Sequence, residues 1–395
     1  MPGKPLSPTT PTVKISRRGV ERLRGGHVWV YRSDVVSAEG VEPGALVAVK
    51  DERGKFLGSA LYSSASQIAI RMISPQAVDD LPGLLRERVA HAIAYRERVV
   101  ENSDAYRVIF SEGDFLPGLI VDRYNDIVTF QVLTQAMDAE PARAAVLAEL
   151  AGQLKPEAVA ERVDARVREL EQLSARKSGL AHGEKNSTIF VMNGVSFHYD
   201  VQGGQKTGAF LDQRENYAAA ARYARGEALD VFCYQGGFAL HLAGRCPRVT
   251  GVDSSRPALE VADRNATLNG REIEWIEANA FDLMRDYAAS GRQYDTIVLD
   301  PPAFAKSRKN LETALRGYKE LNLRALKMLR PGGVLVTCSC SYHVGAGEFL
   351  EVVAESARDS HRNLRLVENR GQAKDHPILL GVPETGYLKC LILST

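Results

Sequence analysis

The sequence predicts an α/β protein: a doubly wound, mostly parallel sheet in the C-terminal half, preceded by a small β-rich domain and an α+β middle domain. From about residue 226, short apolar runs alternate with helical segments, the order typical of a parallel sheet covered by helices. Residues 12–75 consist instead of short strand-like runs between turns. The chain has 395 residues, too many for one ordinary core, so we expect two or three domains.

The N-terminal region predicts a short leader followed by a β-rich domain. Residues 1–12 are rich in Pro and Thr and are expected to be a flexible leader. Over residues 13–78, the segments "HVWVY", "ALVAVKDERGKFLGSALY" and "SQIAIRMI" have the composition of strands, and "ERGK" suits a hairpin turn. These residues are therefore predicted to form one small domain.

The middle of the chain mixes the two periodicities and is predicted as an α+β domain over residues 79–188. Residues 76–104 have helical spacing of apolar positions, residues 106–133 are strand-like, and residues 138–175 are again helical. The polar segment 174–188 is predicted to be a loop.

Residues 189–395 are predicted to form the sheet domain. Its helices are expected at 256–270 and 310–330. The predicted strands are 228–233, 248–253, 273–279, 295–300, 333–339 and 387–394. Ligands of such folds bind at the carboxyl ends of the strands, so the residues that close these strands are the candidate site.

Charge, cysteine usage and hydropathy limit the functional classes. The net charge is +1, but residues 1–32 hold one acidic side chain, Glu21, and seven basic ones: Lys4, Lys14, Arg17, Arg18, Arg22, Arg24 and Arg32. A basic end on a neutral chain favours a polyanionic partner, with a solvated surface as the alternative.

The five cysteines are few, scattered and odd in number, which does not resemble a disulfide framework, and no His/Cys spacing matches a zinc site. The N-terminus has no apolar signal region and no stretch is long enough to span a membrane. We therefore expect a cytoplasmic protein without a metal; its oligomeric state is open, a homodimer included.

The strand ends from residue 230 onward predict a nucleoside cofactor. Asp230 lies in a strand that leads into Gly236 and Gly237, and Asp253 closes the next strand, where a carboxylate can accept hydrogen bonds from both ribose hydroxyls. Asn279 ends the third strand and can face an adenine edge. The glycines do not form G-x-G-x-x-G, so a pyrophosphate, and with it an NAD dehydrogenase, is disfavoured.

This combination resembles the class I S-adenosylmethionine-dependent methyltransferases, and several segments resemble one branch of them, the bacterial large-subunit rRNA cytosine-C5 methyltransferases. These segments are "GAFLDQREN" (208–216), "DVFCYQGGF" (230–238), "LDPPAFAKSR" (299–308), "TCSCS" (337–341) and "GVPETGYLKC" (381–390). "GHVWVYRSDV" (26–35) and "LYSSASQIAIR" (61–71) resemble the family's N-terminal PUA RNA-binding domain, and "EGDFLPGLIVDRYND" (112–126) its middle domain.

The resemblance implies S-adenosyl-L-methionine as cofactor and large-subunit ribosomal RNA as partner. The residues that it implies for the cofactor are Phe210, Asp230, Cys233, Tyr234, Gly236, Gly237, Asp253, Ser254, Asn279, Ala280 and Asp300. Asn279 departs from the Asp of many relatives, but an amide oxygen can still accept a hydrogen bond from the adenine amine. For RNA, Arg17, Arg18, Arg22 and Arg24 are expected to contact phosphates, and Gln213 or Arg214 to reach the RNA or the methionine end of the cofactor.

The neighbouring strand suggests a function for the two cysteines of "TCSCS". In the methyltransferase strand order, the strand that ends at Asp300 lies beside the strand that carries Cys338 and Cys340. Cytosine C5 becomes nucleophilic enough to accept a methyl group once a thiolate has added to C6, and an acid near N3 assists. Cys340, at the open edge, is predicted as the nucleophile and Asp300 as the acid, with Cys338 as a buried strand residue.

Two alternatives stay open. An exocyclic-amine methyltransferase would use Asp-Pro-Pro followed directly by an aromatic residue, whereas here Ala303 separates Pro302 from Phe304. Some RNA cytosine-C5 methyltransferases have a second cysteine at the position of Ala303, so product release here must use another group. The other alternative is a non-catalytic RNA-binding protein with a methyltransferase fold, which the presence of Asp300 and Cys340 disfavours.

Overall fold

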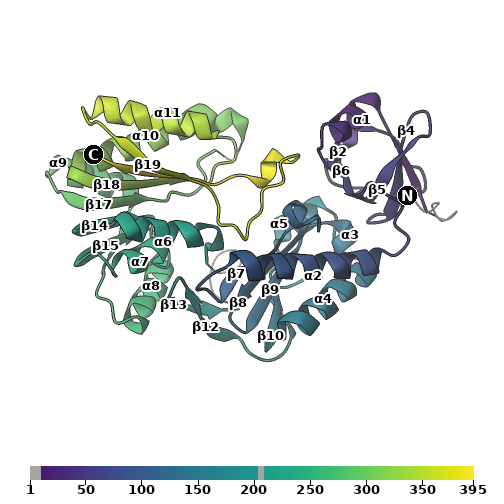
Figure 1. The fold of residues 1–395 in the computed structure, drawn as a ribbon, viewed down its shortest axis with the longest axis horizontal. Helices are drawn as coiled ribbons and strands as arrows, with labels where there is room; N and C mark the ends of the chain where they lie inside the picture. Colours follow the sequence, from purple (N-terminus) through teal and green to yellow (C-terminus); the bar gives the residue numbers. More distant parts are fainter. Residues whose placement is uncertain (1–9, 203–208, 306) are drawn as a thin grey trace.

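The computed structural model describes residues 10–202, 209–305 and 307–395 (Figure 1). Most of the predicted leader, together with Gly208 and Lys306 of the quoted motifs, therefore lies outside the described residues. The described residues form three sheets plus one separate hairpin.

The N-terminal domain is a six-stranded sheet with the order β2-β6-β5-β4-β1-β3. Its strands are β1 (Thr12–Ile15), β2 (Trp29–Tyr31), β3 (Val35–Ser37), β4 (Leu46–Asp51), β5 (Phe56–Tyr62) and β6 (Ile68–Ser74). β4 and β5 form the hairpin predicted at "ERGK". The sequence analysis missed helix α1 (Arg17–Arg24), which begins where the Ser16 side chain accepts a hydrogen bond from the Gly19 amide.

The middle domain is a five-stranded sheet with the order β11-β10-β9-β8-β7, packed on long helices. Its elements are α2 (Leu81–Val99), β7 (Ala105–Phe110), η2 (Ser111–Asp114), β8 (Leu119–Tyr124), β9 (Ile127–Val132), α3 (Gln135–Asp138), α4 (Glu140–Leu154), β10 (Ala158–Glu161), α5 (Ala165–Leu170) and β11 (Gly179–His182). The predicted helical region over 138–175 contains α4 and α5 but also the strand β10, which was missed. The prediction of a loop over 174–188 is wrong, because β11 and the start of β12 lie inside it. β10 has four residues, and all of them are buried. Its sequence therefore lacks the alternation of apolar and polar residues by which a strand is recognised.

A hairpin links the middle domain to the C-terminal domain. It consists of β12 (Ser187–Met192) and β13 (Val195–Asp200), and its aromatic side chains Phe190, Phe197 and Tyr199 belong to the same core as the first helices of the C-terminal domain. The predicted boundary at 188/189 therefore falls within β12, in a strand whose side chains pack into the C-terminal core.

The C-terminal domain is the predicted doubly wound α/β sheet, with the order β16-β15-β14-β17-β18-β20-β19. β14 to β18 are parallel, and β20 joins β18 in antiparallel fashion. The strands are β14 (Glu227–Val231), β15 (Arg248–Asp253), β16 (Glu274–Glu277), β17 (Tyr294–Leu299), β18 (Leu329–Ser339), β19 (Arg365–Arg370) and β20 (Lys389–Ser394). The sequence analysis missed β19, an edge strand with few buried positions.

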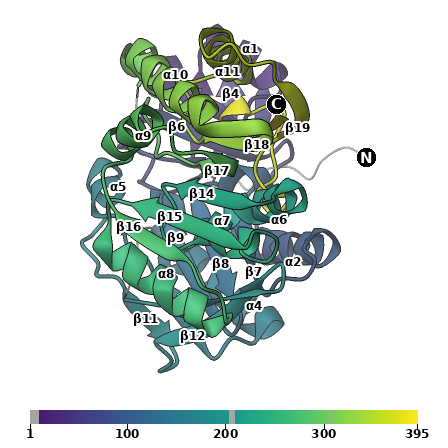
Figure 2. The same cartoon turned by 90° about the vertical axis from the view of Figure 1, so that its left-hand side faces the viewer.

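Helices cover both faces of this sheet, as Figures 1 and 2 show. They are α6 (Arg214–Tyr223), α7 (Gly237–Leu242), α8 (Arg256–Leu268), α9 (Ala280–Ala289), α10 (Leu311–Met328) and α11 (Ala346–Asp359), with the short turns η3 (Leu211–Gln213), η4 (Arg308–Asn310) and η5 (Pro383–Thr385). Alternate residues of β18 serve the two cores: Val336 and Cys338 face the α6 and α7 side, and Leu335 faces the α9 to α11 side. This two-sided burial explains the continuous apolar strands in the sequence.

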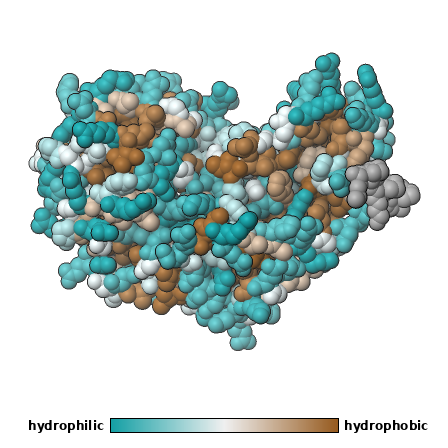
Figure 3. Space-filling model, in the orientation of Figure 1, coloured by the Kyte–Doolittle hydropathy of each residue, from teal (hydrophilic) through white to brown (hydrophobic). Residues whose placement is uncertain are grey.

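The segment 371–388, between β19 and β20, connects the domains. In Figure 1 it extends from the C-terminal sheet into the space beside the N-terminal domain. There the His27 imidazole lies 3.4 Å from the Glu384 carboxylate. Figure 3 shows the surface hollowed between these two domains, with hydrophobic side chains on its floor.

Candidate active site

The turn after β14 has an unusual backbone conformation. Phe232 and Tyr234 have positive φ angles of 69° and 49°, and Gly236 has a φ of 86°. A positive φ is uncommon for non-glycine residues, so two of them in one short turn are consistent with a functional role of this turn. Phe210 lies over this turn, with its ring 5.1 Å from that of Tyr234.

Gly237 was predicted to allow close approach of the cofactor, but the structure shows another reason why this position needs a glycine. A Cβ atom at Gly237 would lie 2.5 Å from the Tyr217 ring, so the residue makes room for packing between α7 and α6. Cys233 is likewise buried, and its Sγ faces Gly251 of β15. These two predicted cofactor residues thus support the turn from behind.

Asp253, at the end of β15, is held by the backbone of two loops. Its two carboxylate oxygens accept hydrogen bonds from the amides of Tyr234 (2.9 Å) and Ser255 (2.8 Å). Each oxygen keeps a second lone pair, so the fixed carboxylate can still accept from a ribose diol. Ser254, which follows it, is exposed at the same strand end.

Asn279 corrects one detail of the sequence analysis. Its side-chain oxygen accepts hydrogen bonds from the amides of Phe281 (2.9 Å) and Asp282 (3.3 Å) and so caps α9, leaving it no lone pair for an adenine amine. The Nδ2 group is what Asn279 can offer, as a donor to a ring nitrogen. Ala280, the first residue of α9, is buried behind it.

The surroundings of Asp230 show whether these residues fit S-adenosylmethionine. Its side chain is fully buried; Oδ2 accepts from the Ala239 amide at 2.8 Å, and Oδ1 has no hydrogen-bond partner among the described residues. Burial raises the pKa of Asp230 to about 8, and the charges of Asp300 and Asp253 add to this effect. A buried acid with a free acceptor suits a ligand that brings N–H donors and positive charge, as S-adenosylmethionine does.

The second half of the site surrounds Cys340, just beyond β18. The Cys340 thiol is partly exposed and lies 3.8 Å from the carbonyl oxygen of Pro301 in the Asp-Pro-Pro segment. β17 and β18 are parallel neighbours, which brings the two segments together as predicted.

The serines on both sides of Cys340 are buried and fix its backbone. The Ser339 hydroxyl donates to the hydroxyl of Tyr318 in α10 at 3.0 Å. The Tyr318 hydroxyl also lies 3.0 Å from the Oγ atom of Ser341. Ser341 Oγ also accepts from the Ala305 amide at 3.2 Å. The Ser-Cys-Ser pattern therefore presents the thiol between two anchored residues.

Asp300 is oriented by the segment that precedes α6. Its carboxylate accepts a hydrogen bond from the Gln213 amide at 2.9 Å, and Gln213 in turn accepts from Asn216 at 2.7 Å, which fixes the direction of its amide. Burial, followed by the charge of Asp212, raises the pKa of Asp300 to about 7, against the opposing hydrogen bond from Gln213. Gln213 is buried and its amide fixes the Asp300 carboxylate, so its predicted contact with RNA or with the cofactor stays a prediction.

Cys338 is a packing residue, as predicted. It is fully buried and lies directly opposite Cys390 across β18 and β20. Burial raises the pKa of the Cys338 thiol well above its ordinary value, and contact with Cys390 adds to this effect. Cys338 is therefore poorly suited to be a nucleophile.

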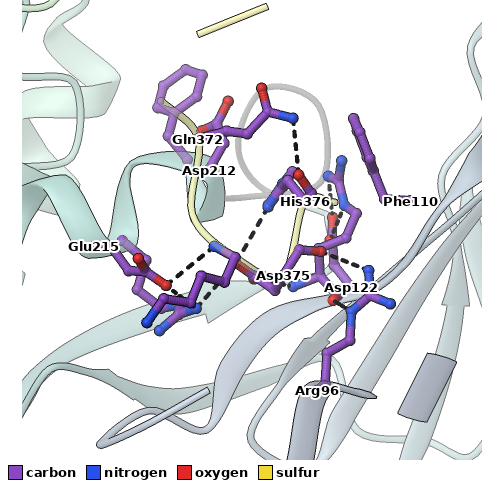
Figure 4. Close-up of polar contacts among 12 residues, drawn as sticks. Arg96, Phe110, Asp122, Asp212, Glu215, Gln372, Asp375 and His376 are labelled. Atoms are coloured by element: carbon purple, nitrogen blue, oxygen red, sulfur yellow. Dashed lines mark hydrogen bonds and ion pairs between the residues drawn. The ribbon is translucent and has the colours of Figure 1, made fainter. Parts of the chain in front are cut away.

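Arg214 does not have the exposed position that RNA contact requires. It is buried, and its guanidinium donates to the Asp375 carboxylate at 3.0 Å. The Asp375 carboxylate also accepts from the Arg107 amide at 2.8 Å. The Asp375 carbonyl oxygen accepts from Arg96 at 2.6 Å (Figure 4). Burial opposes the charge of Asp375, but His376 and Arg214 hold its pKa well below the usual range. Arg214 of α6 thus holds segment 371–388 on the C-terminal domain, while Arg96 and Arg107 connect Asp375 to the middle domain. The burial of Arg214 argues against its predicted contact with RNA.

The four predicted arginines all lie on α1 but differ in their surroundings. Arg18 and Arg22 pair with the buried Asp34 at 2.5 and 2.8 Å, and Arg22 also stacks over the Tyr31 ring at 4.5 Å. Arg17 is 88% exposed beside Glu21, and Arg24 is exposed. Arg17 and Arg24 are thus better placed to meet a phosphate than Arg22.

The sequence analysis missed three residues that surround the thiol and the acid. Tyr387 donates to Asp212 at 2.6 Å, and Lys389 donates to the carbonyl oxygen of Ser341 at 2.6 Å. Tyr387 and Lys389 belong to the quoted "GVPETGYLKC", and Asp212 to "GAFLDQREN", so the motifs contained the signal although no chemistry was assigned to them.

Within the described ranges, no group of three or more His, Cys, Asp or Glu side chains could hold a metal ion. The helices of these same ranges include none that is long and apolar enough to cross a membrane.

Comparison with known proteins defines the class. Residues 13–75 match the model of a PUA-like domain, and residues 157–392 match that of an S-adenosylmethionine-dependent methyltransferase. The fold agrees with the crystal structure of SMU.776 complexed with SAH, with a TM-score of 0.83 over 98% of this chain and 100% of that chain at 18% identity. The protein is therefore a class I methyltransferase with S-adenosylmethionine as its cofactor, preceded by a PUA-like domain.

The particular family follows from the curated relatives. The ribosomal RNA large subunit methyltransferase I of Photobacterium profundum is 37% identical over 394 residues, covering 96% of this chain and 98% of that protein. The enzyme of the same name from Tolumonas auensis is 38% identical over 395 residues, covering 97% and 98%. The chain belongs to the ribosomal RNA large subunit methyltransferase I family.

Proposed function

We propose that this protein methylates C5 of a cytosine in the 23S rRNA of the large ribosomal subunit, through a covalent bond between Cys340 and C6 of the base. The observation that carries the proposal is the 3.8 Å approach of the Cys340 thiol to the Pro301 carbonyl, directly beside Asp300. A nucleophile and an acid then lie at one strand edge, which is the arrangement that C5 chemistry requires.

The reaction begins with addition of the Cys340 thiolate to C6. The Sγ–C6 bond forms, the C5=C6 electron pair shifts toward C4, and N3 gains the electron density. Asp300 delivers its proton to N3, which leaves a neutral adduct whose C5 is enamine-like. With a pKa raised to about 7, Asp300 retains a protonated fraction near neutral pH, unlike an ordinary aspartic acid.

S-adenosylmethionine, when bound, supplies an electrophilic methyl group to this carbon. The C5–methyl bond would form with the enamine electron pair while the bond from this methyl group to the cofactor's sulfonium sulfur breaks, so that the sulfur leaves as a neutral thioether. A base then removes the C5 proton, the C5=C6 bond is restored, Sγ leaves as thiolate and the N3 proton returns to Asp300. Cys340 and Asp300 thus end the cycle in their starting states.

The cofactor residues follow from the first half of the site. Asp253 would hold the ribose, Asn279 would donate to the adenine, and the free oxygen of Asp230 would face the amino-acid end, with Phe210 and Tyr234 flanking the turn. Ser254 and Gly236 border the same strand ends. Cys233, Gly237 and Ala280 support this surface from within.

The RNA would approach across the hollow between the PUA-like domain and the catalytic domain (Figure 3). Tyr342, two residues after Cys340, is 44% exposed and lies within electrostatic range of Tyr31 and Glu384. Arg22 stacks on Tyr31, so these contacts connect one arginine of α1 with the segment that follows Cys340. An exposed aromatic ring near a cation suits a single-stranded RNA with splayed bases.

The position of the transferred methyl group tests the proposal. The purified enzyme should be incubated with 23S rRNA and S-adenosylmethionine, and the RNA digested to nucleosides for mass spectrometry. We expect 5-methylcytidine, absent when the cofactor is omitted. Formation of N4-methylcytidine instead would favour the exocyclic-amine alternative, and no transfer to any RNA would favour the non-catalytic one.

A further inference from the structure

Lys389 is held directly beside the proposed nucleophile. It is the first residue of β20 and pairs in register with Ser339, the last residue of β18. Its ammonium group donates to the carbonyl oxygens of Ser341 at 2.6 Å and of Tyr387 at 2.8 Å. Ser341 follows Cys340 directly, so these bonds fix the cation next to the thiol.

The charge of Lys389 acts on Cys340 more than on any acid. It interacts electrostatically with Cys340 and, less strongly, with Glu348 of α11. Among the described residues, no carboxylate forms a salt bridge with Lys389. Burial lowers the pKa of Lys389 to about 8, so the group remains largely protonated at neutral pH. A half-buried ammonium group without a carboxylate partner is costly unless it stabilises another negative charge.

Other described groups near the thiol disfavour its ionisation. Tyr318 of α10 and Tyr387 interact electrostatically with Cys340, and both are neutral donors or potential anions. The acids Asp300, Asp212 and Glu348 lie at the same strand edge. Within the part of the chain that the structure describes, Lys389 is the cation whose electrostatic contact with Cys340 opposes this set.

We propose that Lys389 is a positioning residue that stabilises the thiolate form of Cys340 and holds the backbone of the Ser-Cys-Ser segment. The role rests on the proposed nucleophilic function of Cys340. The proton of the thiol leaves to solvent, the ammonium group keeps all its protons, and the resulting anion–cation pair persists until the Sγ–C6 bond forms. Because its donors are committed to two carbonyl groups, Lys389 acts as a fixed cation and not as a proton acceptor.

The test is the pH dependence of Cys340 alkylation by iodoacetamide, read by mass spectrometry of the peptide that contains "TCSCSYHV". The other four cysteines are buried, so the native protein reports Cys340 selectively. Lys389→Gln keeps N–H donors for the carbonyls but removes the charge, and we expect the midpoint of its profile to rise by about one pH unit. Lys389→Arg should keep the midpoint near that of the wild type, and so should Lys327→Met, in the last turn of α10 just before the start of β18.

An unchanged midpoint in Lys389→Gln would overturn the proposal, and so would a rise of equal size in Lys389→Arg, which would indicate a purely structural effect. The measurement needs neither RNA nor methyl transfer. If Cys340→Ala retains methylation, the proposed function fails separately, whatever the alkylation profile shows.

Discussion

The thiol of Cys340 lies 3.8 Å from the carbonyl oxygen of Pro301, although 39 residues separate them in the chain. The parallel pairing of β17 with β18 produces this approach, and Tyr318 fixes the serines on both sides of the cysteine. Because Asp300 precedes Pro301, the same pairing brings an acid with a raised pKa to the nucleophile. Most of the proposed chemistry depends on this one strand edge.

Asp253→Ala should weaken S-adenosylmethionine binding by roughly 1–3 kcal/mol, because the ribose would lose its acceptor and two loop amides would lose theirs. Isothermal titration calorimetry measures the loss. Glu260→Ala, on the exposed surface of α8, is the matched control and should bind as the wild type does. Wild-type affinity in Asp253→Ala would remove this residue from the cofactor site.

Asp230 should make the cofactor-free protein less stable as the pH rises. Its folded-state pKa is raised to about 8, so between its ordinary pKa near 4 and pH 8 the unfolded chain releases a proton that the native state retains. The contribution of Asp230 to the free energy of unfolding is therefore largest below about pH 4. It decreases as the pH rises and is lost once the pH has passed about 8.

Asp230→Asn removes this titration while keeping an acceptor for the Ala239 amide. We expect the stability difference between variant and wild type to favour the variant more at pH 8 than at pH 5, as measured by urea unfolding. Asp286→Asn, an exposed carboxylate on α9, should leave the pH dependence as it is. Parallel curves for Asp230→Asn and wild type would show that Asp230 ionises normally in the folded protein.

The arginines of α1 should contribute unequally to RNA binding. Arg17→Gln with Arg24→Gln should lower the slope of log K against log salt by about 0.7 for each phosphate that is no longer neutralised. Arg22→Gln should instead destabilise the PUA-like domain, because the buried Asp34 would lose a partner. Filter binding at several salt concentrations measures the slope, with Arg248→Gln as control, because Arg248 is exposed at the start of β15, at the end of the strand opposite Asp253. A slope unaffected by the double variant would mean that another surface holds the RNA.

The sequence predicted the C-terminal sheet well because its strands are buried on both faces and read as apolar runs. Cys338 was correctly assigned to the interior for the same reason, as an inward position of β18. α1 was missed because its eight residues are mostly charged, so apolar spacing could not reveal it. β10 was missed because a four-residue buried strand within a helical region has no periodicity of its own.

The site was predictable where strand order alone brings residues together, as it does for Asp300 and Cys340. It was not predictable where contacts between residues far apart in the chain determine the position of a side chain. Arg214 lies in a polar motif but is buried against Asp375, 161 residues later in the chain. Lys389 reaches Cys340 because β20 pairs with β18 in antiparallel fashion, a register that local sequence does not encode.

Covalent trapping with 23S rRNA that carries 5-fluorocytosine in place of cytosine tests the nucleophile itself. Fluorine cannot leave C5 as a proton does, so the bond from Sγ to C6 should persist after methyl transfer. We expect a protein–RNA adduct that is stable to denaturant, requires S-adenosylmethionine and maps to the peptide containing Cys340. It should be absent in Cys340→Ala and present in Cys338→Ala, a small core truncation. An adduct that survives in Cys340→Ala, or near-normal turnover of that variant on unmodified RNA, would contradict the assignment of Cys340 as the nucleophile.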